Sequence, residues 1–244
     1  MKRIILILLV FVAFSSQAQT VKVAAAANLR AVFDELKSAF AQSNPKTNVS
    51  ANFGSSGTLL QQILSGAEFD VFMAADNSFP TKLKDKGAAS GEIKTYALGK
   101  LVLWSNTVDV SKGLEMLTDP SVKRIAIAKP ELAPYGDRAM EVLKSTGLYD
   151  KVKDKIIYAD NISQTAQFAQ TGNAEVGFLA LSLTMTPEMK GSVYVIDPKL
   201  YKPVEQAMVL VKSWKVNPDA AKFMKFILSP ESKPIFEKYG YIVP

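Results

Sequence analysis

The sequence of 244 residues contains no cysteine and no histidine. Without thiols, neither a disulfide nor attachment of lipid through a cysteine is possible. The usual protein ligands of zinc, copper and iron–sulfur clusters are missing, and so are the thiol and imidazole groups that act as nucleophile or base in many enzymes. Carboxylate, lysine and hydroxyl groups are what remain for chemistry.

Long hydrophobic runs are also scarce, and the longest stands at the start of the chain. Residues 4–14 are all apolar, follow Lys2 and Arg3, and precede small residues at Ser16 and Ala18, the two positions that a signal peptidase reads. The run is too short to cross a bilayer, which needs about 20 residues. We therefore predict a signal peptide over residues 1–18, cleaved after Ala18, and export of the mature protein, most simply to a bacterial periplasm.

The chain has no strong excess of charge of either sign. Without Lys2 and Arg3, 27 basic residues face 23 acidic ones, which leaves a net charge of +4. The lysines are scattered and often stand beside acidic residues, as in residues 82–86 and 151–155. This pattern is typical of solvated helix faces and lacks the basic stripe interleaved with aromatics that nucleic acid requires. We expect no nucleic-acid partner and a weak general attraction for anions.

Apolar runs alternate with segments of helical period along the mature chain, and the pattern occurs twice. The first set consists of strands near residues 21–25, 49–53 and 71–74 and helices near 29–40 and 58–64. The second set consists of strands near residues 98–104, 124–128, 155–158 and 176–180 and helices near 137–143 and 163–170. Such alternation indicates α/β architecture with largely parallel sheets covered by helices. We predict two such lobes, with a single doubly wound sheet as the alternative.

The C-terminal part of the chain is predicted to return to the first lobe. A strand over residues 206–211 and a helix over residues 218–228 would complete that lobe. Chain crossings near residues 96–101 and 202–208 would then form a hinge. The predicted boundaries are residues 19–99 with 206–244 for the first lobe and residues 100–205 for the second.

The stretch F-G-S-S-G-T-L-L, residues 53–60, combines glycines and hydroxyl residues between a predicted strand and a predicted helix. Amide N–H groups at a helix start lack partners inside the helix, glycine lets a ligand approach, and hydroxyls donate without adding charge. Residues 24–28, 129–136 and 159–163 also lie directly between a strand and a helix. Because open α/β sheets bind ligands beyond the carboxyl ends of their strands, we expect the four loops to enclose a small anion without lysine or arginine. Ordinary N-capped loops are the alternative.

Five segments together form a recognisable set. They are V-K-V-A-A-A-A-N at 21–28, N-F-G-S-S-G-T-L-L-Q-Q-I at 52–63, G-A-E-F-D-V-F-M-A-A-D at 66–76, A-P-Y-G-D-R-A at 133–139 and F-E-K-Y-G-Y at 236–241. In this order they resemble the periplasmic molybdate-binding proteins of ABC transporters over essentially the whole mature chain. The resemblance implies a two-lobed periplasmic binding protein fold of type II with a two-crossing hinge. It also implies that molybdate or tungstate binds in the cleft and passes to a membrane permease, without a cofactor; we expect a monomer.

The resemblance implies one ligand residue in each of the four loops. Asn28 stands where many members carry a hydroxyl residue, and its amide NH₂ can still donate. Ser56 is the serine of the second loop, while Tyr135 and Ile162 are the positions whose backbone N–H groups donate in the third and fourth loops. For Asn28 and Ser56 the alternative role is to cap the helices that follow.

Two neighbours are secondary candidates, Ala27 and Ser55. In some members a tyrosine hydroxyl from the second lobe also reaches the oxyanion, and this sequence has Ala180 there. Either Tyr135 compensates for the missing donor or the affinity is lower. Molybdenum would be held only as the oxyanion, with no direct bond between protein and metal.

Other ligands and an enzymatic role are alternatives. A pocket lined by donors alone suits a fully deprotonated dianion, so sulfate or thiosulfate could replace molybdate. An amino-acid site would need Arg138 with Asp137, and an exported hydrolase would need Lys129 as the base for a serine. Asp70 and Asp76 form a possible carboxylate pair, but capping and turn formation suit their positions better. We expect no enzymatic activity.

Overall fold

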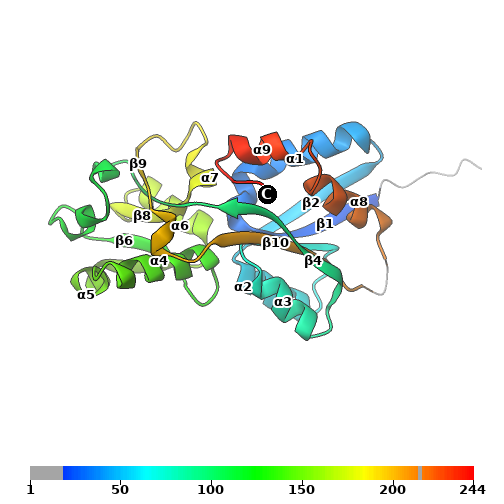
Figure 1. The fold of residues 1–244 in the computed structure, drawn as a ribbon, viewed down its shortest axis with the longest axis horizontal. Coiled ribbons are helices and arrows are strands. Elements are labelled where there is room, and N and C mark those ends of the chain that lie inside the picture. The colour runs from blue at the N-terminus through cyan, green and yellow to red at the C-terminus, as the bar shows by residue number, and fades with distance from the viewer. Residues whose placement is uncertain (1–18, 214–215) are drawn as a thin grey trace, which may run out of the picture.

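The computed structural model describes residues 19–213 and 216–244, and the predicted signal peptide lies outside them. Figure 1 shows two lobes side by side, each with its own sheet and its own helices. No helix in residues 19–213 and 216–244 has both the length and the apolar character needed to cross a membrane.

Each lobe contains one five-stranded mixed sheet, so the prediction of two α/β lobes is confirmed and the single-sheet alternative is wrong. In the first sheet, in the order β2-β1-β3-β10-β4, β1 is parallel to β2 and β3, and β10 is antiparallel to β3 and β4. Its strands are β1 (Gln19–Ala26), β2 (Thr47–Gly54), β3 (Val71–Ala74), β4 (Ala89–Gly99) and β10 (Val204–Val211).

The second sheet, in the order β7-β6-β8-β5-β9, follows the same plan. Strand β6 is parallel to β7 and β8, and β5 is antiparallel to β8 and β9. Its strands are β5 (Leu101–Ser105), β6 (Ile125–Ala128), β7 (Ile156–Ala159), β8 (Val176–Ala180) and β9 (Ser192–Val195).

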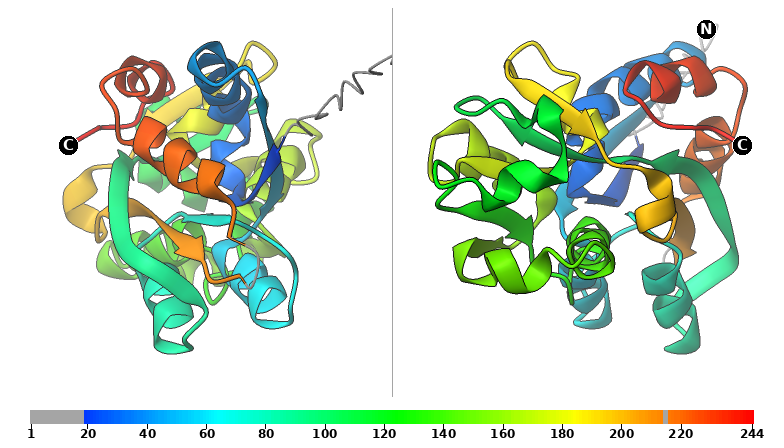
Figure 2. Two further views of the ribbon diagram at one scale, coloured as in Figure 1. Left: turned by 90° about the vertical axis from the view of Figure 1, so that its right-hand side faces the viewer. Right: turned by 60° about the vertical axis from the view of Figure 1, so that its left-hand side comes forward.

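Helices cover both faces of the first sheet, with α1, α8 and α9 on one face and α2 and α3 on the other (Figures 1 and 2). These helices are α1 (Arg30–Ser43), α2 (Ser56–Leu64), α3 (Ser78–Asp85), α8 (Pro218–Ile227) and α9 (Lys233–Lys238). The 3₁₀ turn η1 (Ala27–Leu29) leads into α1. Helix α1 buries Val32, Phe33, Leu36 and Phe40, whose spacing of one, three and four residues places them on one face.

The second lobe has its own helices around its sheet. They are α4 (Pro134–Ser145), α5 (Tyr149–Val152), α6 (Ile162–Gln170) and α7 (Leu181–Thr184). Short 3₁₀ turns complete the lobe at Val110–Lys112, Leu114–Thr118, Lys153–Lys155 and Pro198–Leu200.

The chain crosses between the lobes twice, and the two crossings lie next to each other. Strand β4 ends at Gly99 and β5 begins at Leu101, while β10 starts at Val204, which pairs with Gly99. At Gly99 an added Cβ would lie 2.0 Å from the Tyr135 hydroxyl oxygen, so a side chain has no room in this crossing. The predicted lobe boundaries at residues 99/100 and 205/206 stay predictions.

The prediction of a single strand over residues 98–104 is wrong. These residues contain the end of β4 and most of β5, which continues to Ser105, and most of β4 precedes them. Strand β4 is largely exposed before Tyr96, so it has no continuous apolar run that would mark it as a strand. Strand β9 also alternates between exposed and half-buried residues and was not predicted.

The two lobes are in contact rather than separated by an open cleft. Ala26, Ala27 and Ala75 of the first lobe belong to the same buried cluster as the hydrophobic core of the second lobe. The structure therefore shows the closed arrangement of the two lobes.

Candidate functional site

A small cavity lies between the lobes where the predicted loops meet. It is lined by residues from both lobes: Ala26, Ala27, Asn28, Gly54, Ser55, Ser56, Ala75, Ala133, Pro134, Tyr135 and Ile162. All six predicted site residues are in this set. None of the lining residues carries a charged side chain.

The ends of strands and the starts of helices place these residues at the cavity. Strands β1, β2 and β3 end at Ala26, Gly54 and Ala74, at the same edge of the first sheet. The turn η1 and the helices α2, α4 and α6 begin beside the cavity. The first N–H groups of a helix have no acceptor inside it, and the helix dipole is positive at that end. The cavity wall is therefore rich in uncharged donors.

Asn28 is fully buried, and its side-chain amide forms hydrogen bonds with other side chains of the first lobe. Its Nδ2 donates to Gln206 Oε1 and to Tyr241 Oη, both at 2.8 Å. Gln206 is oriented in turn, because its Nε2 donates to the carbonyl oxygens of Ala75 at 3.2 Å and Val204 at 3.4 Å. Both amide hydrogens of Asn28 are thus used, and within residues 19–213 and 216–244 its Oδ1 has no hydrogen-bond partner.

This geometry changes the role expected of Asn28. It does not cap a helix through its side chain, so the capping alternative is wrong. Its NH₂ group is occupied in the closed arrangement, which leaves the backbone N–H groups of Ala27 and Asn28 at the start of η1 as the donors of the first loop.

The two serines of the second loop have different roles. Ser55 is the N-cap of α2: its Oγ accepts from Thr58 N at 3.3 Å and donates to Thr58 Oγ1 at 2.7 Å. Ser56 Oγ accepts from the N–H of Ala75 at 3.0 Å. Since Ser56 is buried and acts there as the acceptor, its hydroxyl proton is available to a ligand in the cavity.

Tyr135 lies in the first turn of α4 and is buried. Its hydroxyl group lies beside Gly99 at the hinge and has no hydrogen-bond partner within the part of the chain that the structure describes. Burial raises the pKa of this hydroxyl well above its usual value, so the phenol is neutral. The backbone N–H of Tyr135, in the first turn of α4, is the donor that the resemblance implies.

Ile162 is the first residue of α6 and is buried. The N-cap residue Asn161 accepts from the N–H groups of Ser163 and Gln164 through its Oδ1, at 3.0 Å each. The cap thus leaves the N–H of Ile162 for another acceptor.

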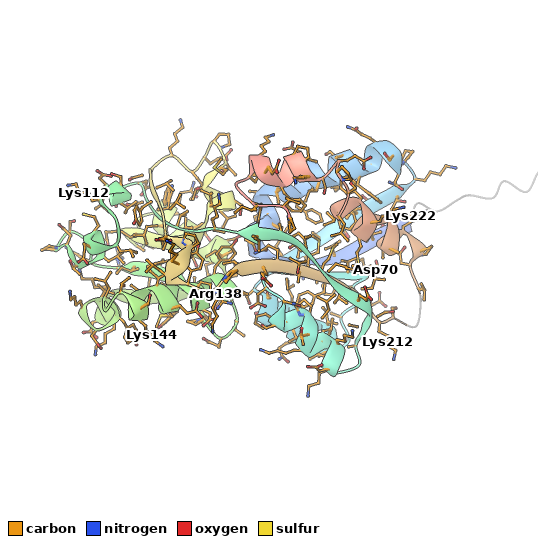
Figure 3. The ribbon with its side chains drawn as sticks, viewed as in Figure 1. Asp70, Lys112, Arg138, Lys144, Lys212 and Lys222 are labelled. Carbon is orange, nitrogen blue, oxygen red and sulfur yellow. The ribbon has the colours of Figure 1, made fainter. Side chains whose placement is uncertain are left out.

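The cations considered for other functions are paired with carboxylates. Lys129 Nζ donates to Asp160 Oδ1 at 2.6 Å, and this hydrogen bond raises the pKa of Lys129, the opposite of what a general base needs. Arg138 bonds Asp137 and Glu141 and lies on α4 near the hinge (Figure 3). Neither residue lines the cavity.

The two aspartates considered as a pair have separate structural roles. Asp70 Oδ2 accepts from the Lys22 N–H at 2.7 Å and from Asn217 Nδ2 at 3.1 Å, at the end of the first lobe away from the cavity (Figure 3). Asp76 Oδ1 accepts from the N–H and the hydroxyl of Ser78 at the start of α3. Across residues 19–213 and 216–244, no three metal-ligating side chains are grouped.

Residues 21–242 match the family model of the bacterial extracellular solute-binding proteins. The chain belongs to this family. Solute-binding proteins bind a ligand rather than convert it or use a cofactor, so the predicted absence of enzymatic activity is confirmed. The extracellular location of the family also supports the predicted export.

Molybdate-binding proteins are among the relatives of this solute-binding protein. It is 40% identical to a molybdate-binding protein of Rhodobacter capsulatus, over 97% of this chain and 94% of that protein. It is 38% identical to one of Azotobacter vinelandii, over 94% of this chain and 92% of that protein. The solved structure of a periplasmic molybdate-binding protein of A. vinelandii matches with a TM-score of 0.84 and 33% identity, covering 92% of this chain and 99% of that chain. These findings confirm the resemblance and the two-lobed fold.

Proposed function

We propose that this solute-binding protein binds molybdate, and tungstate, in the interlobe cavity and delivers it to an ABC-transporter permease at the inner membrane. The observation that supports this most strongly is the cavity itself, where four helix starts and the Ser56 hydroxyl meet without a charged side chain. The relatives named above support the choice of oxyanion.

Molybdate is a fully deprotonated dianion, which accepts hydrogen bonds and donates none. The proposed donors are Ser56 Oγ and the N–H groups of Asn28, Tyr135 and Ile162, with the N–H groups of Ala27 and Ser55 as secondary donors. A hydrogen bond to a charged partner contributes about 1.5–3 kcal/mol, so several such donors can replace a cationic side chain. The metal atom would have no direct protein ligand.

The position of the tyrosine that some members use is Ala180, which ends β8, is fully buried and supplies no hydroxyl. In this proposal the second lobe contributes the backbone donors of Tyr135 and Ile162, and the first lobe contributes the Ser56 hydroxyl.

Binding is coupled to lobe closure in this proposal. An anion that contacts Ser56 and Ile162 together touches both lobes only when they are closed, so it stabilises that form. The permease would recognise the closed form. We also propose cleavage of the signal peptide after Ala18, lobe boundaries at residues 99/100 and 205/206, and a monomeric protein.

Calorimetric titration of the mature protein with molybdate, tungstate and sulfate tests the proposal. We expect molybdate and tungstate to bind with similar affinity and sulfate far more weakly. Ser56→Ala should weaken molybdate binding, whereas Ser65→Ala, at the exposed end of the same helix, should not. Tighter binding of sulfate or thiosulfate than of molybdate would support the alternative ligand and overturn the proposal.

A further inference from the structure

Among the described residues, four hydrogen bonds cross directly from one lobe to the other around the cavity. They are Gly57 N to Leu132 O at 2.8 Å, Ser163 Oγ to Ala27 O at 3.0 Å, Ser182 Oγ to Asn28 O at 2.9 Å, and Tyr241 Oη to Ser182 Oγ at 3.1 Å. Two of them end on consecutive carbonyl groups of the first ligand loop. Closure of the lobes is therefore stabilised by contacts of the protein with itself as well as by contacts with a ligand.

Ser163 and Ser182, here called the serine clasp, come from two different helices of the second lobe. Ser163 is the second residue of α6 and follows Ile162 directly, while Ser182 is the second residue of α7. Neither serine lines the cavity. The clasp can therefore act on a ligand only through the position of the lobes.

The first lobe holds the two acceptor carbonyls in place. Tyr241 Oη, near the C-terminus, lies 3.1 Å from both Asn28 O and Ser182 Oγ and donates to this pair. The Asn28 side chain is bonded to Tyr241 and to Gln206 on β10. The acceptors thus belong to a fixed part of the first lobe, and the donors move with the second lobe.

We propose that Ser163 and Ser182 are positioning residues that hold the lobes closed and slow the release of the bound oxyanion. This inference rests on the proposed function. A ligand enters the open form, in which the clasp bonds are absent, so the association rate does not depend on them. Release requires the lobes to reopen, which breaks both bonds, so the dissociation rate does depend on them.

The expected change per serine is modest and measurable. One neutral hydrogen bond corresponds to a factor of about 2 to 10 in rate. Both carbonyls keep a partner when a serine is removed, because Ala27 O also accepts from the N–H of Arg30 and Asn28 O also accepts from Tyr241. The penalty for an unsatisfied buried carbonyl is therefore avoided.

The experiment measures association and release of radiolabelled molybdate on the mature protein. In Ser163→Ala and Ser182→Ala, release should be about 2- to 10-fold faster, and in the double variant about 4- to 100-fold faster, with unchanged association. Ser163→Thr, which keeps the hydroxyl, should release at close to the wild-type rate. Ser145→Ala is the matched control, because Ser145 Oγ bonds only carbonyls within the second lobe, those of Val142 and Leu200.

The melting temperature of each ligand-free variant shows whether it folds like the wild type. A double variant that folds and releases molybdate at the wild-type rate would overturn the clasp and leave the proposed function intact. A double variant that binds molybdate more slowly than the wild type but releases it at the wild-type rate would also overturn the clasp. A wild type that binds no molybdate would overturn the proposed function, and this inference with it.

Discussion

Replacing Gly57 with alanine opposes lobe closure without removing any group from the cavity. Gly57 is the second residue of α2, and its N–H donates to Leu132 O at 2.8 Å. An added Cβ would lie 2.9 Å from Leu132 Cα and 3.1 Å from Leu132 O, and backbone atoms cannot turn away as a side-chain tip can. Because carbon atoms in contact are about 3.5–4.0 Å apart, the second lobe must move back by about 0.5–1 Å at this point.

The magnitude follows from the cost of that overlap in the closed form. Overpacking of this kind costs about 1–3 kcal/mol. If closure is required for tight binding, the molybdate affinity of Gly57→Ala falls by about 5- to 150-fold. In the open form the new methyl group does not meet Leu132, and alanine favours a helix over glycine by up to about 1 kcal/mol. The ligand-free variant should therefore be no less stable than the wild type.

Titration calorimetry with molybdate and thermal unfolding without ligand measure the two effects separately. Gln61→Ala, on the same helix at an exposed position, is the control and should leave the affinity unchanged. Wild-type affinity in Gly57→Ala would refute the identification of the closed form with the binding form. A loss of ligand-free stability that matches the loss of affinity would show a folding defect instead.

Three further predictions concern the site and its surroundings. Ser56→Ala should weaken molybdate binding by about 10- to 150-fold in calorimetry, since one hydrogen bond to a charged ligand contributes about 1.5–3 kcal/mol; an unchanged Kd would rule out that contact. Lys129→Ala should leave the Kd unchanged, because Lys129 pairs with Asp160 and lies outside the cavity; a large loss would show that a cation holds the anion. Burial raises the pKa of Tyr241 to about 12, although its hydrogen bonds to Ser182 and Asn28 oppose the shift. The unfolded chain loses this proton near pH 10, so the contribution of Tyr241 to the free energy of unfolding in urea should be constant below about pH 10 and be lost from there to about pH 12. Tyr241→Phe should reduce this loss, and an equal loss in the variant would contradict the assignment.

The parts of the fold that were predictable are those with a strong local signal. The buried runs of β3 and β6 stand between turn residues, and α1 shows its apolar spacing directly in the sequence. The place of this loop at the interlobe cavity was predictable for the same reason, because glycine and serine between a strand and a helix mark the start of α2. Strand β4 carried no such signal, since its first half is polar and exposed and it is held in place by pairing with β10.

The side-chain geometry of the site was not predictable, because it depends on residues far away in the chain. Asn28 is bonded to Gln206 and Tyr241, which are 178 and 213 residues away. No local pattern indicates that these contacts use both of its amide hydrogens. The clasp has the same character: Ser182 is an ordinary serine in the sequence and gains its role from the carbonyl of Asn28 across the lobe interface.

The most direct test of the account is a crystal structure of the mature protein with molybdate, with the metal located by its anomalous scattering. The account predicts one molybdenum peak in the cavity, surrounded by Ser56 Oγ and the backbone N–H groups of Asn28, Tyr135 and Ile162. No lysine or arginine nitrogen should lie within hydrogen-bond distance of the anion. A peak outside the interlobe cavity, or an anion held by lysine or arginine, would contradict it.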